Sequence, residues 1–284
     1  MPTSEYTTTA SRKALSCAEI ISEILSSLPL PDVIQRSIQV NRIFQSEAKH
    51  TAVSRFASIV RPYVADHVHA LVDLLRENRS LIVGSCALKM LLSDEGWEPR
   101  NLNILVPRNN VNIFLTFFNS KHYSPTQIPV APHLVHYASR AFFCEHSSQK
   151  PIIITESIDD SVLTPLLAST CTAEFICMTG GGLADIYPHL SSRRIALRSS
   201  RTIKEPTSFS KSLMERGFDV KSSSEYMPHD VCPIVWRRIN GLRGIWIKDW
   251  DASNSVKDIF LGEHHRWCLD TQCLNPECLR SRDI

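Results

Sequence analysis

Short apolar runs that alternate with helix-periodic segments most constrain the fold of this chain. Residues 81–83 are Leu-Ile-Val, and apolar residues between positions 87 and 92 then recur at helical spacing. Residues 101–106 alternate between polar and apolar side chains, and residues 152–155 form a β-branched run. Strands and helices have these two different periods. The pattern therefore predicts strands that alternate with helices, in an α/β or α+β core.

Residues further along extend the same pattern. Apolar positions in residues 114–118 and 162–167 predict two more helices, and residues 175–178 predict another strand. We expect a mixed sheet with flanking helices, preceded by a small helical module.

Composition places the chain among globular proteins. Hydrophobic residues make up 43% of the 284 residues and charged residues 21%, which suits a packed core. A net charge of +2 is too small to indicate nucleic-acid or membrane binding by itself. No apolar run is long enough to span a membrane, and the first residues lack a secretory pattern. We therefore expect a cytoplasmic or nuclear protein whose nine scattered cysteines are thiols.

The N-terminal part of the chain is predicted to be helical. Residues 1–17 are polar and are expected to form a flexible arm, and residues 18–75 follow as a helical module. Prolines end the first helix, and Asp32 can cap a second helix that reaches Phe44. A third helix is expected from residue 52 to residue 75, with a kink or break at Pro62.

A Gly-Ser turn followed by a strand with paired polar residues carries a family resemblance. Gly84-Ser85 stands between the first strand and its helix, and Asn101 and Asn103 begin the next strand. This arrangement resembles the core of the nucleotidyltransferase superfamily. The resemblance implies a turn that approaches nucleotide phosphates, and a strand with two carboxylates that hold Mg²⁺. Further along, Phe175-Ile176, Tyr187-Pro188 and the segment 215–218 (Glu-Arg-Gly-Phe) resemble a group of fungal proteins with this fold. The resemblance covers residues 75–280.

Both acid positions of that pattern are amides in this sequence. Asn101 and Asn103 offer neutral oxygens where Mg²⁺ prefers charge, so we predict a pseudoenzyme. Glu156, at the end of a later strand, is expected to be a remaining third acid. Three further acids in the preceding loop are either substitutes for the lost pair or ordinary solvated residues: Asp94, Glu95 and Glu98.

The helical module resembles an F-box, a group of short helices that binds a small adaptor of cullin-based ubiquitin ligases. The resemblance rests on the segment 18–44 and implies apolar contacts with the adaptor. The residues expected to make them are Ile20, Ile24, Leu28, Pro29, Val40 and Phe44. The alternative is that these helices only cover the α/β core.

The C-terminal part is rich in Trp and Cys. His265, Cys268, Cys273 and Cys278 lie close together in sequence and can supply four zinc ligands. The alternative is a set of thiols packed beside Trp267. No other cofactor is expected.

Two remaining segments have phosphate-binding alternatives. Residues 180–182 are three glycines without the rest of a P-loop, so a turn is favoured over a phosphate cradle. Residues 193–204 are basic but lack interleaved aromatic residues, so a solvated surface is favoured over a nucleotide or nucleic-acid site.

These observations predict two domains, residues 18–75 and residues 76–284. The favoured function is a non-catalytic interaction protein, in which the helices recruit a ligase adaptor and the degenerate core recognises a partner. One alternative is an active nucleotidyltransferase that uses substitute acids, and another is a zinc-stabilised nucleic-acid-binding protein.

Overall fold

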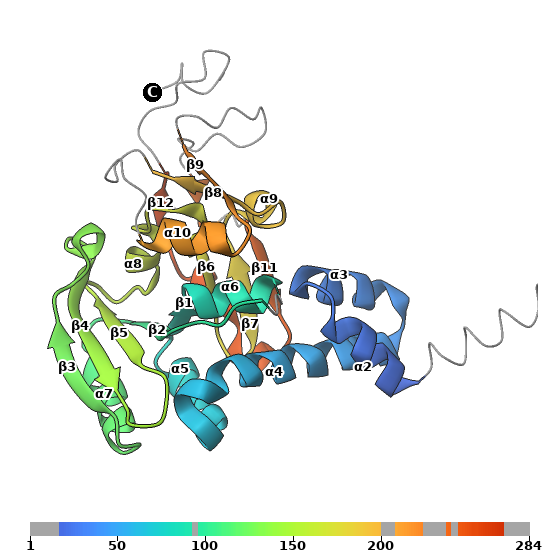
Figure 1. Cartoon of the computed structure of the whole chain (residues 1–284), viewed down its shortest axis with the longest axis horizontal. Helices are drawn as coiled ribbons and strands as arrows, with labels where there is room; N and C mark the ends of the chain where they lie inside the picture. The colour runs from blue at the N-terminus through green and yellow to red at the C-terminus, as the bar shows by residue number, and fades with distance from the viewer. Residues whose placement is uncertain (1–16, 93–95, 200–207, 224–236, 240–243, 270–284) are drawn as a thin grey trace, which may run out of the picture.

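An eight-stranded mixed sheet forms the centre of the molecule (Figure 1). The computed structural model describes residues 17–92, 96–199, 208–223, 237–239 and 244–269. The strand order is β11-β7-β6-β1-β2-β5-β4-β3. Within this sheet β2 and β5 pair in parallel, and the other neighbours pair antiparallel. The strands are β1 (Leu81–Val83), β2 (Leu102–Val106), β3 (Ser124–Ile128), β4 (Ala138–Glu145), β5 (Ile152–Ser157), β6 (Ile176–Met178), β7 (Gly182–Asp185) and β11 (Trp246–Asp249).

Helices cover both faces of this sheet, which confirms the predicted α/β class. The first four are α2 (Ala18–Ser26), α3 (Leu30–Val40), α4 (Arg42–Val64) and α5 (Val68–Glu77). The others are α6 (Ser85–Leu92), α7 (Val111–Asn119), α8 (Leu163–Leu167), α9 (Pro188–Ser191), α10 (Ser208–Glu215) and α11 (Val256–Leu261). Two short strand pairs lie outside the main sheet, β8 (Ile195–Arg198) with β9 (Asp219–Ser222) and β10 (Arg237–Arg238) with β12 (Arg266–Trp267).

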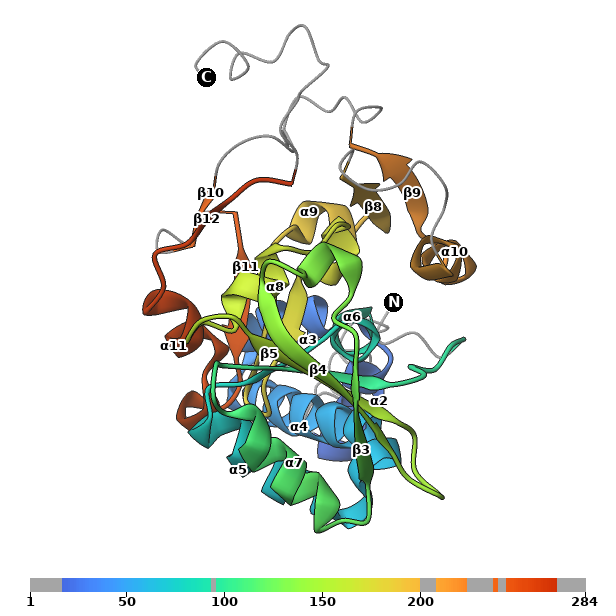
Figure 2. The ribbon, with the colours of Figure 1, turned by 90° about the vertical axis from the view of Figure 1, so that its left-hand side faces the viewer.

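Alternate residues of each strand enter two separate cores. Ile82, Ile104 and Ile154 pack with helices α4, α6 and α7, and we call their side of the sheet the α4 face. Leu81 and Leu105 pack with α8, α9 and α11, and we call their side the α8 face. Figure 2 shows α10 and α11 on opposite sides of the molecule. The two-residue period of a strand thus decides which core receives each side chain.

The N-terminal helices differ from the sequence prediction in their boundaries. The second helix ends at Val40, and α4 begins at Arg42 because the Asn41 side chain accepts hydrogen bonds from the backbone N–H groups of the first turn. The helix runs through Pro62 and ends at Val64, where the next residue has a φ of 48°. The predicted break at Pro62 was therefore wrong by two residues, and α4 starts ten residues earlier than expected.

The same helices share a core with the sheet. Ile21 and Leu25 of α2 are buried in the cluster that also contains Ile82 of β1. Arg55 of α4 donates to the carbonyl oxygens of Leu25, Ser26 and Leu28, and so holds the turn after α2. The helices therefore cover the α/β core, as the alternative interpretation expected for them. A domain boundary after residue 75 stays a prediction.

The three consecutive glycines form a turn, as predicted. Residues 179–181 connect β6 to β7, which begins at Gly182, and the Thr179 N–H donates to the Gly182 carbonyl at 2.9 Å. A Cβ atom on Gly182 would lie 2.1 Å from Asp249 Oδ1, so only glycine fits there. Leu183 continues as strand β7, not as a helix that holds a phosphate.

Two further sequence predictions concern membranes and cysteines. In the part of the chain that the structure describes, no helix combines the length and apolar character needed to cross a membrane. The described cysteines carry free thiols, as expected: Cys17, Cys86, Cys144, Cys171, Cys177 and Cys268.

Asp185, at the end of β7, is a buried carboxyl group with no cation among its described hydrogen-bond partners. It is 1% exposed, and its Oδ1 accepts from the Tyr187 backbone N–H at 2.9 Å. Burial raises the pKa of Asp185 to about 7, against the lowering effect of this hydrogen bond. The folded protein therefore keeps a proton that the unfolded chain releases above pH 4.

We predict that Asp185 makes the protein less stable as the pH rises from 4 to 7. The Asp185→Asn variant retains an acceptor for the Tyr187 N–H and removes the ionisation. Its free energy of unfolding at pH 8 should exceed that of the native protein by on the order of 2–4 kcal/mol, with little difference at pH 4. Urea unfolding at both pH values measures this. Parallel pH dependences in the two proteins would contradict it.

Candidate functional site

The Gly84-Ser85 turn lies directly against the strand that carries Asn103. Gly84 has a φ of 70°, which favours glycine, and α6 begins at the next residue. A Cβ atom on Gly84 would lie 2.8 Å from Asn103 Nδ2. Turn and strand therefore touch at this point.

Asn101 and Asn103 bind each other. Asn101 Nδ2 donates a hydrogen bond to Asn103 Oδ1 at 2.5 Å. Strand alternation places the Asn103 side chain on the α8 face, and Asn101 lies one residue before the start of β2. The Cys86 thiol donates to the Asn101 backbone carbonyl at 3.5 Å and links the pair to α6. The result is a neutral, partly exposed pair of amides joined by one hydrogen bond.

The side chains beside Asn103 in the sheet are not acidic. Strand register places Val83 on one side of Asn103 and Ile153 on the other. The row continues across the described sheet in both directions without a carboxylate: Ile247, Ala184, Cys177, Val83, Asn103, Ile153, Phe143 and Thr126. This row gives a metal ion no charged oxygen to bind.

Glu156 points to the opposite face of the sheet. It pairs with Val106, three residues beyond the pair formed by Asn103 and Ile153. An odd separation reverses the face, and three residues correspond to about 10 Å along a strand. The expectation that Glu156 is a third acid of this site was therefore wrong. The strand period, applied to the register of β2 and β5, explains why.

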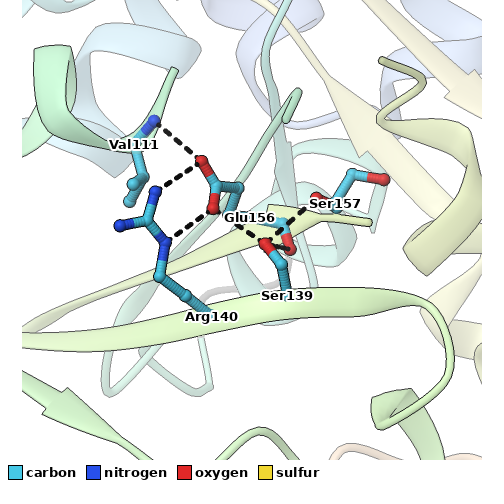
Figure 3. A network of polar contacts seen from close by, with 5 residues as sticks. All are labelled: Val111, Ser139, Arg140, Glu156 and Ser157. Atoms are coloured by element: carbon cyan, nitrogen blue, oxygen red, sulfur yellow. Dashed lines mark hydrogen bonds and ion pairs between the residues drawn. The ribbon is translucent and has the colours of Figure 1, made fainter. Parts of the chain in front are cut away.

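The Glu156 carboxylate has its own set of partners (Figure 3). Arg140 of β4 donates to both carboxylate oxygens, from Nε at 2.8 Å and from Nη2 at 3.1 Å. The Ser139 hydroxyl donates at 2.7 Å, and the Val111 N–H at the start of α7 donates at 3.4 Å. The strand register is irregular between Ala138 and Arg140, and this irregularity lets the adjacent residues Ser139 and Arg140 reach the same carboxylate.

These contacts keep Glu156 ionised inside the protein. The Glu156 side chain is 3% exposed, and burial raises its pKa. The hydrogen bonds and charge of Arg140, together with the bond from Ser139, outweigh burial, so that the net pKa is lowered. Glu156 thus joins β4, β5 and α7, and no sequence pattern indicated Arg140 as its partner.

Basic and aromatic side chains surround the loop before β2. The Arg216 guanidinium lies 4.1 Å from the centre of the Trp97 ring, and Lys89 Nζ lies 5.2 Å from it. Glu98 forms ion pairs with Lys89 at 3.4 Å and with Lys150 at 3.8 Å. The contact between Trp97 and Arg216 joins segments more than a hundred residues apart, so no local sequence pattern predicts it.

The loop acids that the sequence offered as substitutes for carboxylates at Asn101 and Asn103 are only partly described. Glu98 is engaged by two lysines and its side chain is 65% exposed. Asp94 and Glu95 lie outside the described residues. The described part of the loop therefore does not supply a carboxylate to the asparagine pair.

The residues expected to bind an adaptor fall into two groups. Ile20, Ile24 and Val40 are 44%, 43% and 54% exposed, and Pro29 is also exposed. Phe44 is buried in the core and Leu28 packs against it, so these two stabilise the helices instead.

The proposed zinc ligands are also only partly described. His265 Nε2 lies 3.0 Å from Glu263 Oε2, and Cys268 is partly buried. Cys273 and Cys278 lie outside the described residues. Within the described ranges, no three His, Cys, Asp or Glu residues lie together as metal ligands would. The zinc site stays a prediction.

Comparison with known proteins gives a distant structural similarity. No protein-family model and no curated protein matches the sequence. A CCA-adding enzyme in apo form I matches 49% of this chain with 11% identity and a TM-score of 0.34. The complex of a CCA-adding enzyme with CTP matches 51% with 12% identity and a TM-score of 0.36. The matched region spans about a third of those enzyme chains, 35% and 36%.

Proposed function

We propose that this chain is a non-catalytic interaction protein with a degenerate nucleotidyltransferase-like core. The observation that carries the proposal is the hydrogen bond between Asn101 and Asn103, at the positions where the sequence resemblance implies two metal-binding acids. The contact between Gly84 and Asn103 supports the assignment of these positions.

The chemistry of the pair argues against metal-dependent catalysis. Mg²⁺ binds carboxylates because their negative charge offsets the cost of removing its water molecules. Each carboxylate near a surface contributes several kcal/mol of Coulomb attraction by an order-of-magnitude estimate. Asn101 and Asn103 contribute no charge, and the neighbours of Asn103 in the sheet row, Val83 and Ile153, are apolar. Without the attraction of two carboxylates, the occupancy of the site by Mg²⁺ falls by orders of magnitude.

We predict no metal-dependent nucleotide transfer by the native chain. Incubation with labelled ATP, GTP, CTP or UTP and Mg²⁺ or Mn²⁺ should leave the nucleotides unconverted, both with RNA acceptors and with the protein itself as acceptor. Robust turnover that disappears in an Asn101→Leu/Asn103→Leu variant would sink the proposal and support the active-enzyme alternative. An unfolding midpoint close to that of the native chain verifies that the double-leucine variant is folded.

A second part of the proposal concerns the N-terminal helices. We propose that they bind the small adaptor of a cullin-based ubiquitin ligase, as the F-box resemblance implies. The support is that Ile20 and Ile24, four residues apart on α2, are both more than 40% exposed. Isoleucine side chains at this spacing form a row on one side of a helix, which suits docking on a partner helix.

We predict that an Ile20→Ser/Ile24→Ser variant of the full chain binds the purified adaptor at least tenfold more weakly than the native chain. The expected loss reflects two apolar contacts of about 1 kcal/mol each. Calorimetric titration measures it. Ile113→Ser on α7, where Ile113 is 47% exposed, is the matched control and should bind like the native chain. Absence of binding by the native chain would remove the ligase role and leave the pseudoenzyme proposal intact.

A further inference from the structure

Two arginines beside the loop before β2 form no ion pair with any residue that the structure describes. Arg100 lies three residues after Trp97, and its exposed side chain makes no hydrogen bond to the described chain. Arg216, directly after α10, places its guanidinium 4.1 Å from the centre of the Trp97 ring. Three residues span at most about 11 Å, so both cations belong to one small area. We call Trp97, Arg100 and Arg216 the arginine cluster.

The Arg216 guanidinium keeps hydrogen-bond donors that the described residues do not use. Its Nη1 is buried without an acceptor, while the side chain as a whole is partly exposed. Burial lowers the pKa of Arg216, and the charge of Arg100 lowers it further, by more than the charge of Glu215 raises it. The arginine cluster therefore carries positive charge that its surroundings do not offset, and an anion between the two arginines would reduce their repulsion.

The lysines on the same loop are already engaged. Lys89 and Lys150 both form ion pairs with Glu98. Lys89 also donates to the Trp97 carbonyl oxygen at 2.7 Å, and Lys150 donates to that of Pro99 at 3.1 Å. These contacts use the charge of Glu98 and hold the loop in place. The two arginines are therefore the cations at this loop that remain available to a ligand.

The number of available cations and the state of the aromatic ring select the kind of anion. A phosphate monoester carries a charge of about −2 and three acceptor oxygens, which match two guanidinium groups, whereas a carboxylate carries a single charge. Nucleotides and RNA commonly stack a base on an aromatic side chain. Here Arg216 lies over the Trp97 ring, and Lys89 Nζ lies 5.2 Å from its centre. These features favour a phosphate group that carries no base, as on a phosphorylated side chain.

We infer that the arginine cluster binds a phosphorylated side chain of a partner protein, with Arg100 and Arg216 donating to the phosphate oxygens. The inference rests on the proposed role as an interaction protein and names a class of partner for it. Trp97 holds Arg216, so one of the two donors is positioned before the ligand binds. Binding needs no metal ion, because guanidinium groups meet the phosphate and the adjoining Asn101 and Asn103 are neutral.

Binding of the full chain to an array of random twelve-residue peptides, each with one central phosphoserine or phosphothreonine, tests this inference. We expect bound peptides whose unphosphorylated versions bind at least tenfold more weakly in fluorescence anisotropy. Arg100→Gln and Arg216→Gln should each weaken binding of the phosphorylated peptides at least tenfold, because each removes one charge-assisted set of hydrogen bonds. Arg108→Gln is the matched control, since it removes the same charge from an exposed position beyond the opposite end of β2.

Unfolding midpoints close to that of the native chain verify that the variants are folded. Arg100→Gln, at an exposed position, decides the outcome if Arg216→Gln does not fold. No binding, equal binding of phosphorylated and unphosphorylated peptides, or equal binding by Arg100→Gln and Arg108→Gln would overturn the inference. Tighter binding of ATP or of single-stranded RNA than of any phosphopeptide would also overturn it. Failure of the proposed function is distinct from these outcomes, because it shows as nucleotide turnover.

Discussion

The antiparallel pairing of β1 with β2 is the constraint on which the site depends. It places Val83 opposite Asn103, so that the glycine that follows β1 comes to lie against the Asn103 amide. The same pairing, continued by the parallel pairing of β2 with β5, sets the row of side chains that surrounds the amide. Next to this glycine two uncharged amides, Asn101 and Asn103, are hydrogen-bonded to each other.

Side chains alternate between the two faces of a sheet along each strand, and this alternation separates Asn103 from Glu156. Asn103 belongs to the α8 face, while Glu156 belongs to the α4 face and there joins Arg140 and the start of α7. A carboxylate that is buried, paired and hydrogen-bonded contributes mainly to the structure, because an uncompensated buried charge is costly. The core thus uses the Glu156 carboxylate as a structural link on one face of the sheet and presents the neutral Asn103 amide on the other.

The central strands and the helix that opens at the Gly-Ser turn could be predicted from the sequence, because apolar runs and the Gly-Ser pair are local signals. Helix boundaries that depend on one capping residue were harder to predict. Asn41 is an example, because its side chain caps the start of α4, a helix of twenty-three residues. The partner of Glu156 and the stacking of Arg216 on Trp97 depend on long-range register and packing. Strand β3 has a weak apolar pattern because it is an exposed edge, so its sequence resembles a loop.

The absence of charge at the asparagine pair is tested most directly by Mn²⁺ binding, measured by electron paramagnetic resonance of the free ion. The native chain and an Asn101→Leu/Asn103→Leu variant should bind equally little Mn²⁺, while Asn101→Asp/Asn103→Asp should gain a site. Mn²⁺ binding by the native chain that the leucine variant loses would contradict the account.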